Sequence, residues 1–364
     1  MIEIAKDLTG VYSQPKRLLQ EIHDSSLLLA TRSKTLNNFG LFNGKTGVLL
    51  ALHESFSLLD HNAKSIIQSA MDELQDDISE FAADTGDSFS HGIFGIGWAA
   101  SILYRKKYLS SNAAEVMQGF DDELYKLVLY RRANNHSLEN GTLGRMNYYF
   151  SQIAQERQHK SDRYRNVLNT EALLLLVDNL LESNQEILSR LGEKELPVQY
   201  LLDNSQYFQQ IFGALTTLTS KGIRMPIAET QQMQFLRAFV RLIDIAGNGP
   251  GSINLHQLLP IINCLMKLAA QNYIVEQRVN KYPGLLQDLM GESYNIHSTV
   301  TLLQQATFRA TASQSDSRII LAELLDKTTE SWDSPGIAGM GGKLCLMASL
   351  YKHQSSCLAD CFLI

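Results

Sequence analysis

The chain has 364 residues, of which 45% are hydrophobic and 19% are charged, and its formal net charge is -6 at pH 7. This mild charge of mixed sign argues against a basic surface for nucleic acid or a polybasic membrane patch. The sequence also lacks a run of about 20 apolar residues, which a helix needs to span a bilayer. The first residues lack the pattern of a signal peptide, so we expect a cytoplasmic protein. Four cysteines, at positions 264, 345, 357 and 361, are too few for a disulfide framework and are expected to be reduced.

In chain order, the segments between the seven prolines carry apolar residues at helical spacing, and strand-like alternation is scarce. The sequence therefore predicts an all-α protein. We expect helices over residues 15–31, 44–57, 63–82, 92–107, 113–131, 141–158, 170–181, 197–219, 229–245, 253–271, 275–290, 293–309, 317–328 and 336–352. These helices can be grouped into seven pairs.

A short glycine motif recurs along the chain and marks where helices begin. Gly44, Gly92, Gly141 and Gly336 are each followed by a second glycine three residues later and by an apolar helix. The first three are 48 and 49 residues apart, and the last gap of 195 residues is close to four times 49. This spacing predicts seven repeat units over about residues 39–352, with less regular copies near residues 213, 251 and 284.

Helices of two kinds alternate within these repeats. Those that begin at a motif glycine are apolar nearly all round, whereas those between them have one polar face. We expect the first kind to be buried and the second to be external. The predicted architecture is one α/α toroid domain over residues 1–364, with an inner ring of apolar helices inside an outer amphipathic ring and all motif loops at one mouth. The glycines are expected to let neighbouring inner helices approach closely.

The stretches HGIFGIGWA, PGIAGMGGKL and NGKTGVLLAL, in repeats of about 49 residues over residues 39–351, resemble the lanthionine synthetase C-like family. Members of this family are the cyclase components of lanthipeptide biosynthesis. The resemblance implies an α/α toroid that acts on a ribosomally made precursor peptide, whose serines and threonines a partner peptide dehydratase has dehydrated. In the family, a zinc ion held by two cysteines and a histidine activates the thiol that closes each thioether ring.

The positions of those zinc ligands hold other residues in this chain. When the family's cysteine-bearing stretch is aligned at Pro250, the position of its cysteine holds Ala246. When the cysteine-histidine stretch is aligned at Gly284, the positions of its cysteine and histidine hold Tyr282 and Pro283. Alanine and proline cannot bind zinc. We therefore expect no zinc or other cofactor. The resemblance then implies either cyclisation without the usual zinc or a non-catalytic peptide-binding role.

His91 directly precedes a motif glycine and is expected at the mouth. A histidine is suited to acid–base catalysis near neutral pH, and this stretch resembles a family segment whose histidine transfers protons. A structural role, either as a cap of the helix or bonded within the loop, is the alternative, and the polar residues Asn43 and Asn140 at the matching positions agree with capping. These two asparagines, together with Trp332 and Asp333 before the last motif, are candidates for peptide contact, and an aromatic staple is the alternative for Trp332.

Carboxylates near the expected mouth support a second hypothesis. Asp84 and Asp87 precede His91, and Glu139 precedes Asn140. Asp87 and Glu139 could be the acid and base of a glycan-active α/α barrel, in which two carboxylates flank the bond that is cleaved. The structural alternative is the attraction of carboxylates to helix N-termini. A third hypothesis is a non-enzymatic interaction scaffold.

Overall fold

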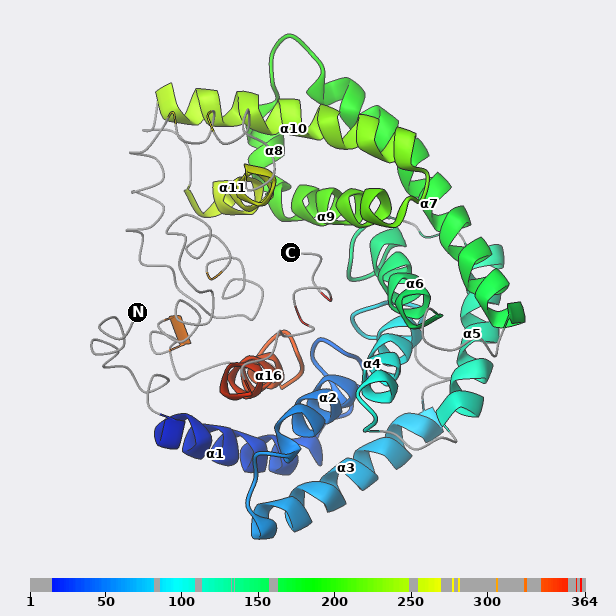
Figure 1. Ribbon diagram of the computed structural model, residues 1–364, viewed down its shortest axis with the longest axis vertical. Helices are drawn as coiled ribbons and strands as arrows, with labels where there is room; N and C mark the ends of the chain where they lie inside the picture. Colours follow the sequence, from blue (N-terminus) through cyan, green and yellow to red (C-terminus); the bar gives the residue numbers. More distant parts are fainter. Residues whose placement is uncertain are drawn as a thin grey trace. The chain divides into compact units, whose positions relative to one another are not determined.

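Figure 1 shows a computed structural model of the chain. It describes residues 15–81, 86–108, 113–131, 133, 135–156, 163–248, 255–269, 277, 281, 306, 324–325, 335–352, 358 and 361. Within these residues the regular structure is entirely α-helical, which confirms the expected fold class, and it contains no strand. None of the described helices is both long and apolar enough to cross a membrane.

The chain divides into two compact units, each assembled from segments that are distant in the sequence. The first unit comprises Met1–Val177, His297–Val300 and Leu325–Leu358. The second comprises Asp178–Ile296, Thr301–Leu324 and Ala359–Ile364. The expected single toroid over residues 1–364 remains a prediction.

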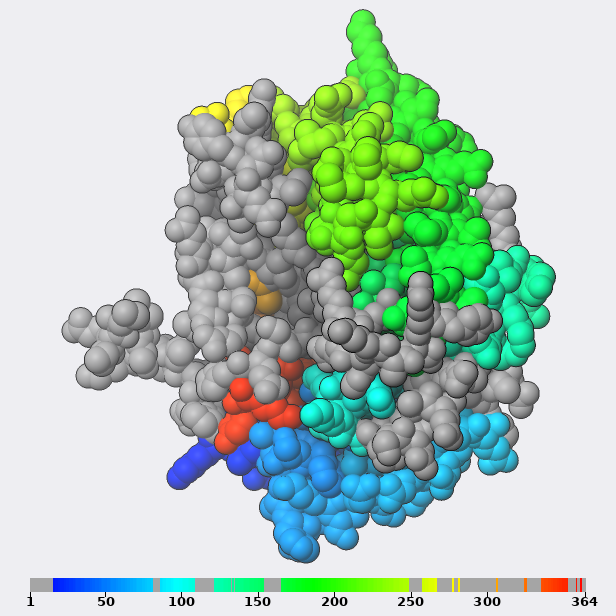
Figure 2. Space-filling view, turned by 45° about the vertical axis from the view of Figure 1, so that its right-hand side comes forward, coloured from blue at the N-terminus to red at the C-terminus, as the bar shows by residue number. Residues whose placement is uncertain are grey.

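Helices from both ends of the chain pack together in the first unit. It contains α1 (Pro15–Ser33), α2 (Lys45–Phe56), α3 (His61–Phe81), α4 (Ile93–Arg105), α5 (Ala113–Tyr130), α6 (Thr142–Glu156), the first part of α7 (Arg163–Leu191) and α16 (Met340–Tyr351). Helix α16 packs on α2, α2 on α4, and α4 on α6, while α1 and α3 flank α2 and α5 lies against α4 (Figure 1). In Figure 2 the red surface of α16 borders the blue surface of the first helices. The last repeat therefore lies beside the first.

The distinction between buried and external helices is clear in α2 and α3. Every residue of α2 from Lys45 to Ser55 is buried, as expected for a helix that begins at a motif glycine. Helix α3 buries one face only, and its charged and amide side chains are exposed or half-buried. Its buried stripe consists of Ala63, Ile67, Ala70, Met71, Leu74 and Ile78.

The second unit has a core of phenylalanine rings. It contains the rest of α7, α8 (Val198–Asp203), α9 (Ser205–Lys221), α10 (Met225–Asn248) and α11 (Leu255–Ala269). Phe208 and Phe212 of α9 face Phe235 and Phe239 of α10, with ring centroids 5.9 Å and 5.7 Å apart in the two pairs. Helix α11 packs on the same helix α9. Aromatic surfaces thus hold α9 and α10 together, and the aliphatic side chains of α11 complete the core.

Most described helices end within a few residues of their expected bounds, but α7 and the segment after it differ. Helix α7 extends beyond the expected 170–181 at both ends. In its C-terminal extension the polar Asn184 has a buried partner, because its Nδ2 donates to Gln231 Oε1 of α10 (3.0 Å). The helix expected over 197–219 is interrupted at Asn204, whose side chain donates to a backbone carbonyl of α8. The helices expected over 275–290, 293–309 and 317–328 lie almost entirely outside the described residues.

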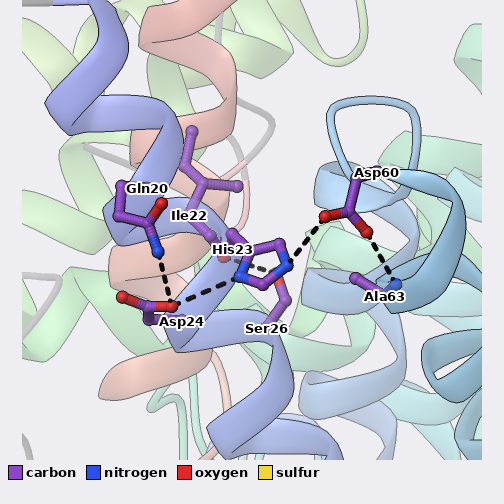
Figure 3. A network of polar contacts seen from close by, with 7 residues as sticks. All are labelled: Gln20, Ile22, His23, Asp24, Ser26, Asp60 and Ala63. Atoms are coloured by element: carbon purple, nitrogen blue, oxygen red, sulfur yellow. Dashed lines mark hydrogen bonds and ion pairs between the residues drawn. The ribbon is translucent and has the colours of Figure 1, made fainter.

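A polar network joins α1 to the start of α3 (Figure 3). In His23 of α1, the ring nitrogen Nε2 lies 3.5 Å from Asp60 Oδ2, and Nδ1 lies 3.2 Å from Asp24 Oδ1. Asp60 also accepts a hydrogen bond from the backbone N–H of Ala63 (2.8 Å), which is the geometry of a helix N-cap. This backbone bond is the main reason that the pKa of Asp60 is lowered.

Candidate functional site

Each helix that begins at a motif glycine follows a loop, which we name its motif loop. The motif loops are residues 38–44, 86–92, 135–141 and 335–339. In the first three, the first N–H of the helix donates to a carbonyl seven residues earlier; the pairs are Lys45 with Asn38 (2.8 Å), Ile93 with Gly86 (2.8 Å) and Thr142 with Asn135 (3.0 Å). The loop carbonyls thus satisfy helix N–H groups that side-chain caps satisfy elsewhere.

Backbone hydrogen bonds also join the first motif loop to the second, the second to the third, and the last to the first. The N–H of Phe42 donates to the carbonyl of Ser90 (2.9 Å), and the N–H of Ser90 donates to the carbonyl of Glu139 (3.0 Å). The N–H of Ala338 donates to the carbonyl of Phe42 (3.0 Å). We name these three bonds the loop ladder. Because Phe42, Ser90 and Glu139 each lie two residues before a motif glycine, the ladder sets the first three loops side by side in the same register.

The motif glycines are required by this packing of loops. A Cβ atom on Gly95 would overlap the carbonyl oxygen of Phe89 and lie 3.0 Å from Leu41 Cβ of the neighbouring loop. Gly144 repeats the pattern: a Cβ atom there would overlap the carbonyl oxygen of Leu138 and lie 2.5 Å from Phe89 Cβ of the neighbouring loop. Close backbone approach was the expected reason for these glycines. Their partners, however, are the motif loops and not the neighbouring inner helices.

The last repeat departs from the expected register. Helix α16 begins at Met340 and its N-cap is Gly339, so Gly336 lies within the motif loop and does not start the helix. A Cβ atom on Gly336 would overlap the carbonyl oxygen of Phe42. The glycine of the last repeat thus allows the last loop to approach the first.

His91 lies where the first and second motif loops meet. Its backbone N–H donates to Ser88 Oγ (3.0 Å), and its ring nitrogen Nδ1 lies 3.3 Å from Asn38 Nδ2. Of the structural alternatives for His91, capping of α4 by its side chain is wrong, because the N-cap is Gly92 and no side chain makes a cap hydrogen bond there. A histidine bonded to the loops agrees with the contacts to Asn38 and Ser88. The residue is exposed, so its ring is accessible to a ligand.

Asn43, His91 and Asn140 are equivalent residues on successive motif loops. Each directly precedes the first glycine of its motif, and each is exposed. Ser90 Oγ donates to Asn140 Oδ1 at 3.5 Å, which ties this side chain to the neighbouring loop. We name the three residues the loop-face row. Amide and imidazole groups each offer both a donor and an acceptor, which is the chemistry that a peptide backbone requires.

The two candidate carboxylates have different surroundings. Asp87 forms an ion pair with Arg145 of α6 (2.7 Å), whose side chain is almost fully buried. Burial lowers the pKa of Arg145 and Asp87 opposes that shift, so Asp87 stabilises the charge of a buried guanidinium. Glu139 is exposed, and its backbone carbonyl takes part in the loop ladder. The remaining candidates from the sequence, Asp84, Trp332 and Asp333, lie outside the described residues.

The position that corresponds to the first family zinc ligand does not fit a metal. Ala246 lies inside α10 and is 1% exposed, so a buried methyl group occupies this place. Tyr282 and Pro283 lie outside the described residues. Across the described parts of the chain, no three His, Cys, Asp or Glu side chains gather into a metal-binding group. Of the cysteines, Cys264, Cys345 and Cys361 are buried thiols.

A buried polar network in the first unit was not predicted. Asp121 of α5 accepts a hydrogen bond from the Tyr148 hydroxyl of α6 and pairs with Arg165 of α7. Arg165 also donates to Gln152 Oε1 (3.2 Å), and Gln152 donates to Ser101 of α4. Burial raises the pKa of Asp121 even though Arg165 opposes the shift. Polar residues at helical spacing in α6 are the only sequence signal for this network.

Comparison with known proteins adds no relative: the sequence matches no family model and none of the curated proteins at a significant level.

Proposed function

We propose that this chain is a lanthionine synthetase C-like protein that binds a dehydrated, ribosomally made precursor peptide along its loop-face row. The observation that carries the proposal is the loop ladder, because it aligns Asn43, His91 and Asn140 on adjacent loops. An extended peptide presents a carbonyl and an N–H at every residue, and a row of amide and imidazole groups can pair with them.

The proposed architecture is an α/α toroid of seven helix pairs. The packing of α16 on α2 and the bond from Ala338 to Phe42 support it, since a closed ring requires the last repeat to contact the first. The spacing of the glycine motifs supports the count of seven. Three further repeats would lie between the third and the last.

Zinc has no part in the proposal, because Ala246 supplies no ligand. A cyclase of this kind must bring a peptide thiolate to the β-carbon of a dehydro residue and deliver a proton to the α-carbon. His91 is the residue of the loop-face row whose ring nitrogens can accept and release a proton. Ring formation and peptide binding alone are the two versions of the proposal.

Peptide binding is the first test. The probe is a short fluorescent peptide rich in Ser, Thr and Cys whose serines have been converted to dehydroalanine, and the unconverted peptide is the control. Replacing the loop-face row by alanine should weaken binding of the probe at least about tenfold, since two or three net hydrogen bonds are lost. The matched control is the double variant of His61 and Asn62, exposed residues of the same types at the start of α3.

A second measurement separates the two versions. Addition of a thiol to dehydroalanine leaves the peptide mass unchanged but removes one thiol that N-ethylmaleimide could alkylate. If wild-type protein accelerates the loss of alkylatable thiol and H91A does not, the protein is a cyclase. Binding without acceleration identifies a peptide-binding scaffold. No difference in affinity between the loop-face row variant and the His61 and Asn62 control refutes the proposed site.

A further inference from the structure

The side chains of Asn38 and His91 meet between the first two motif loops, and a hydrogen bond fixes the direction of the Asn38 amide. Asn38 Oδ1 accepts from the backbone N–H of Gly40 (2.8 Å). A backbone N–H can bond only an acceptor, so the amide oxygen faces Gly40 and the amide nitrogen faces the second loop. That nitrogen, Nδ2, lies 3.3 Å from His91 Nδ1.

This contact decides which ring nitrogen of neutral His91 carries the proton. The NH₂ group of Asn38 is a donor, so His91 Nδ1 must be the acceptor, and the proton is on Nε2. The backbone around the ring is fixed as well. The N–H of His91 donates to Ser88 Oγ (3.0 Å), and a Cβ atom on Gly40 would overlap the backbone of His91, so the two loops are in direct contact.

We propose that Asn38 is a positioning residue that holds the His91 ring in the Nε2–H tautomer, so that His91 donates a hydrogen bond to a carbonyl oxygen of the bound peptide. This inference rests on the proposed function and names the peptide group that the second motif loop recognises. A carbonyl oxygen fits because it accepts, whereas an ammonium group at the same place would oppose a donor with another donor. At His91, the loop-face row then binds a backbone carbonyl of the peptide and not a backbone N–H.

The tautomer can be measured without any ligand. In protein labelled with ¹⁵N-histidine, two-bond ¹H–¹⁵N correlations well above the ordinary histidine pKa distinguish Nδ1–H from Nε2–H, and H91A identifies the signals of His91. We expect Nε2–H in the wild type. The N38D variant keeps an acceptor for Gly40 but presents an acceptor to the ring, so it should favour Nδ1–H. An Nδ1–H tautomer in the wild type, or an unchanged tautomer in N38D, overturns the proposal.

Affinity for the dehydroalanine peptide is the second readout. H91A should bind about fivefold more weakly, because one net hydrogen bond to a neutral acceptor is lost, and N38D should lose a similar factor. H91Q should recover most of the affinity, since its amide nitrogen can replace the Nε2–H donor. Equal affinities for wild type, N38D and H91A would overturn the recognition role. If the wild type binds no peptide, the proposed function and this recognition role both fail, while the tautomer still decides whether Asn38 positions His91.

Discussion

The buried His53 of α2 should make the first unit less stable as the pH falls through the mildly acidic range. The residue is 7% exposed, its ring stacks on Tyr108 with centroids 5.3 Å apart, and its Nε2 lies 3.3 Å from the side-chain nitrogen of Gln75. Burial lowers the pKa of His53 from 6.5 to about 4, with Asp72 opposing the shift. A charged imidazolium is therefore disfavoured in the folded state.

The sign of the effect follows from proton binding. Between pH 6.5 and about 4 the unfolded chain binds a proton at His53 and the folded chain does not, so the free energy of unfolding falls as the pH falls through this range. Above pH 6.5 the full stability is present. With these two pKa values, the contribution of His53 to stability decreases by about 2 kcal/mol between pH 7.5 and pH 5.

Urea unfolding of the wild type and H53F at both pH values tests this reasoning. Phenylalanine keeps a ring beside Tyr108 but cannot bind a proton, and groups other than His53 titrate in both proteins. In a W332F background Trp98 is the only tryptophan, and since it is buried in α4 its fluorescence reports on the first unit. We expect the wild type to lose about 2 kcal/mol more than H53F. An equal loss in both proteins would refute the buried, neutral state of His53.

Two further changes test the loops and the unpredicted network. In thermal unfolding, G95A should lower the free energy of unfolding by about 2 kcal/mol or more, because the added Cβ would overlap a backbone carbonyl. The control G86A, with no atom within 4 Å of the added Cβ, should lower it by less than about 0.5 kcal/mol. Equal losses in the two variants would contradict the close packing of the loops. Y148F should lower the free energy of unfolding by about 1–3 kcal/mol, because buried Asp121 loses a hydrogen bond. The control Y130F changes a tyrosine that is 81% exposed and should have little effect. Unchanged stability of Y148F would contradict the network.

The helices and their burial could be predicted because both depend on local pattern. A motif glycine followed by an apolar segment identified α2 and α4, and the alternation of apolar and polar faces identified α3 as external. The extent of α7 could not be predicted in this way. Asn184 is polar, yet it is buried because Gln231 from α10 supplies its partner, and that contact depends on tertiary structure.

The candidate site was predicted only in part, since sequence spacing identifies positions but not contacts. The equivalence of Asn43, His91 and Asn140 follows from the repeat, and their exposure agrees with it. The pairing of Asp87 with Arg145, 58 residues away, has no such signal, because an ion pair between a loop and a later helix follows no period. Nor does the sequence reveal that Asn38 turns its amide nitrogen toward His91.

The loop ladder explains how one motif could serve both stability and the proposed binding. Its hydrogen bonds use backbone N–H and carbonyl groups and its close contacts use glycines, so the ladder places little demand on the side chain that precedes each motif. That residue can therefore vary between repeats, as Asn43, His91 and Asn140 do, without loss of the register that aligns them. A row with one imidazole between two amides is an arrangement that such a scaffold permits. If the row binds a peptide as proposed, H91Q is the change that should separate chemistry from binding, because glutamine keeps a hydrogen-bond donor but cannot transfer a proton near neutral pH.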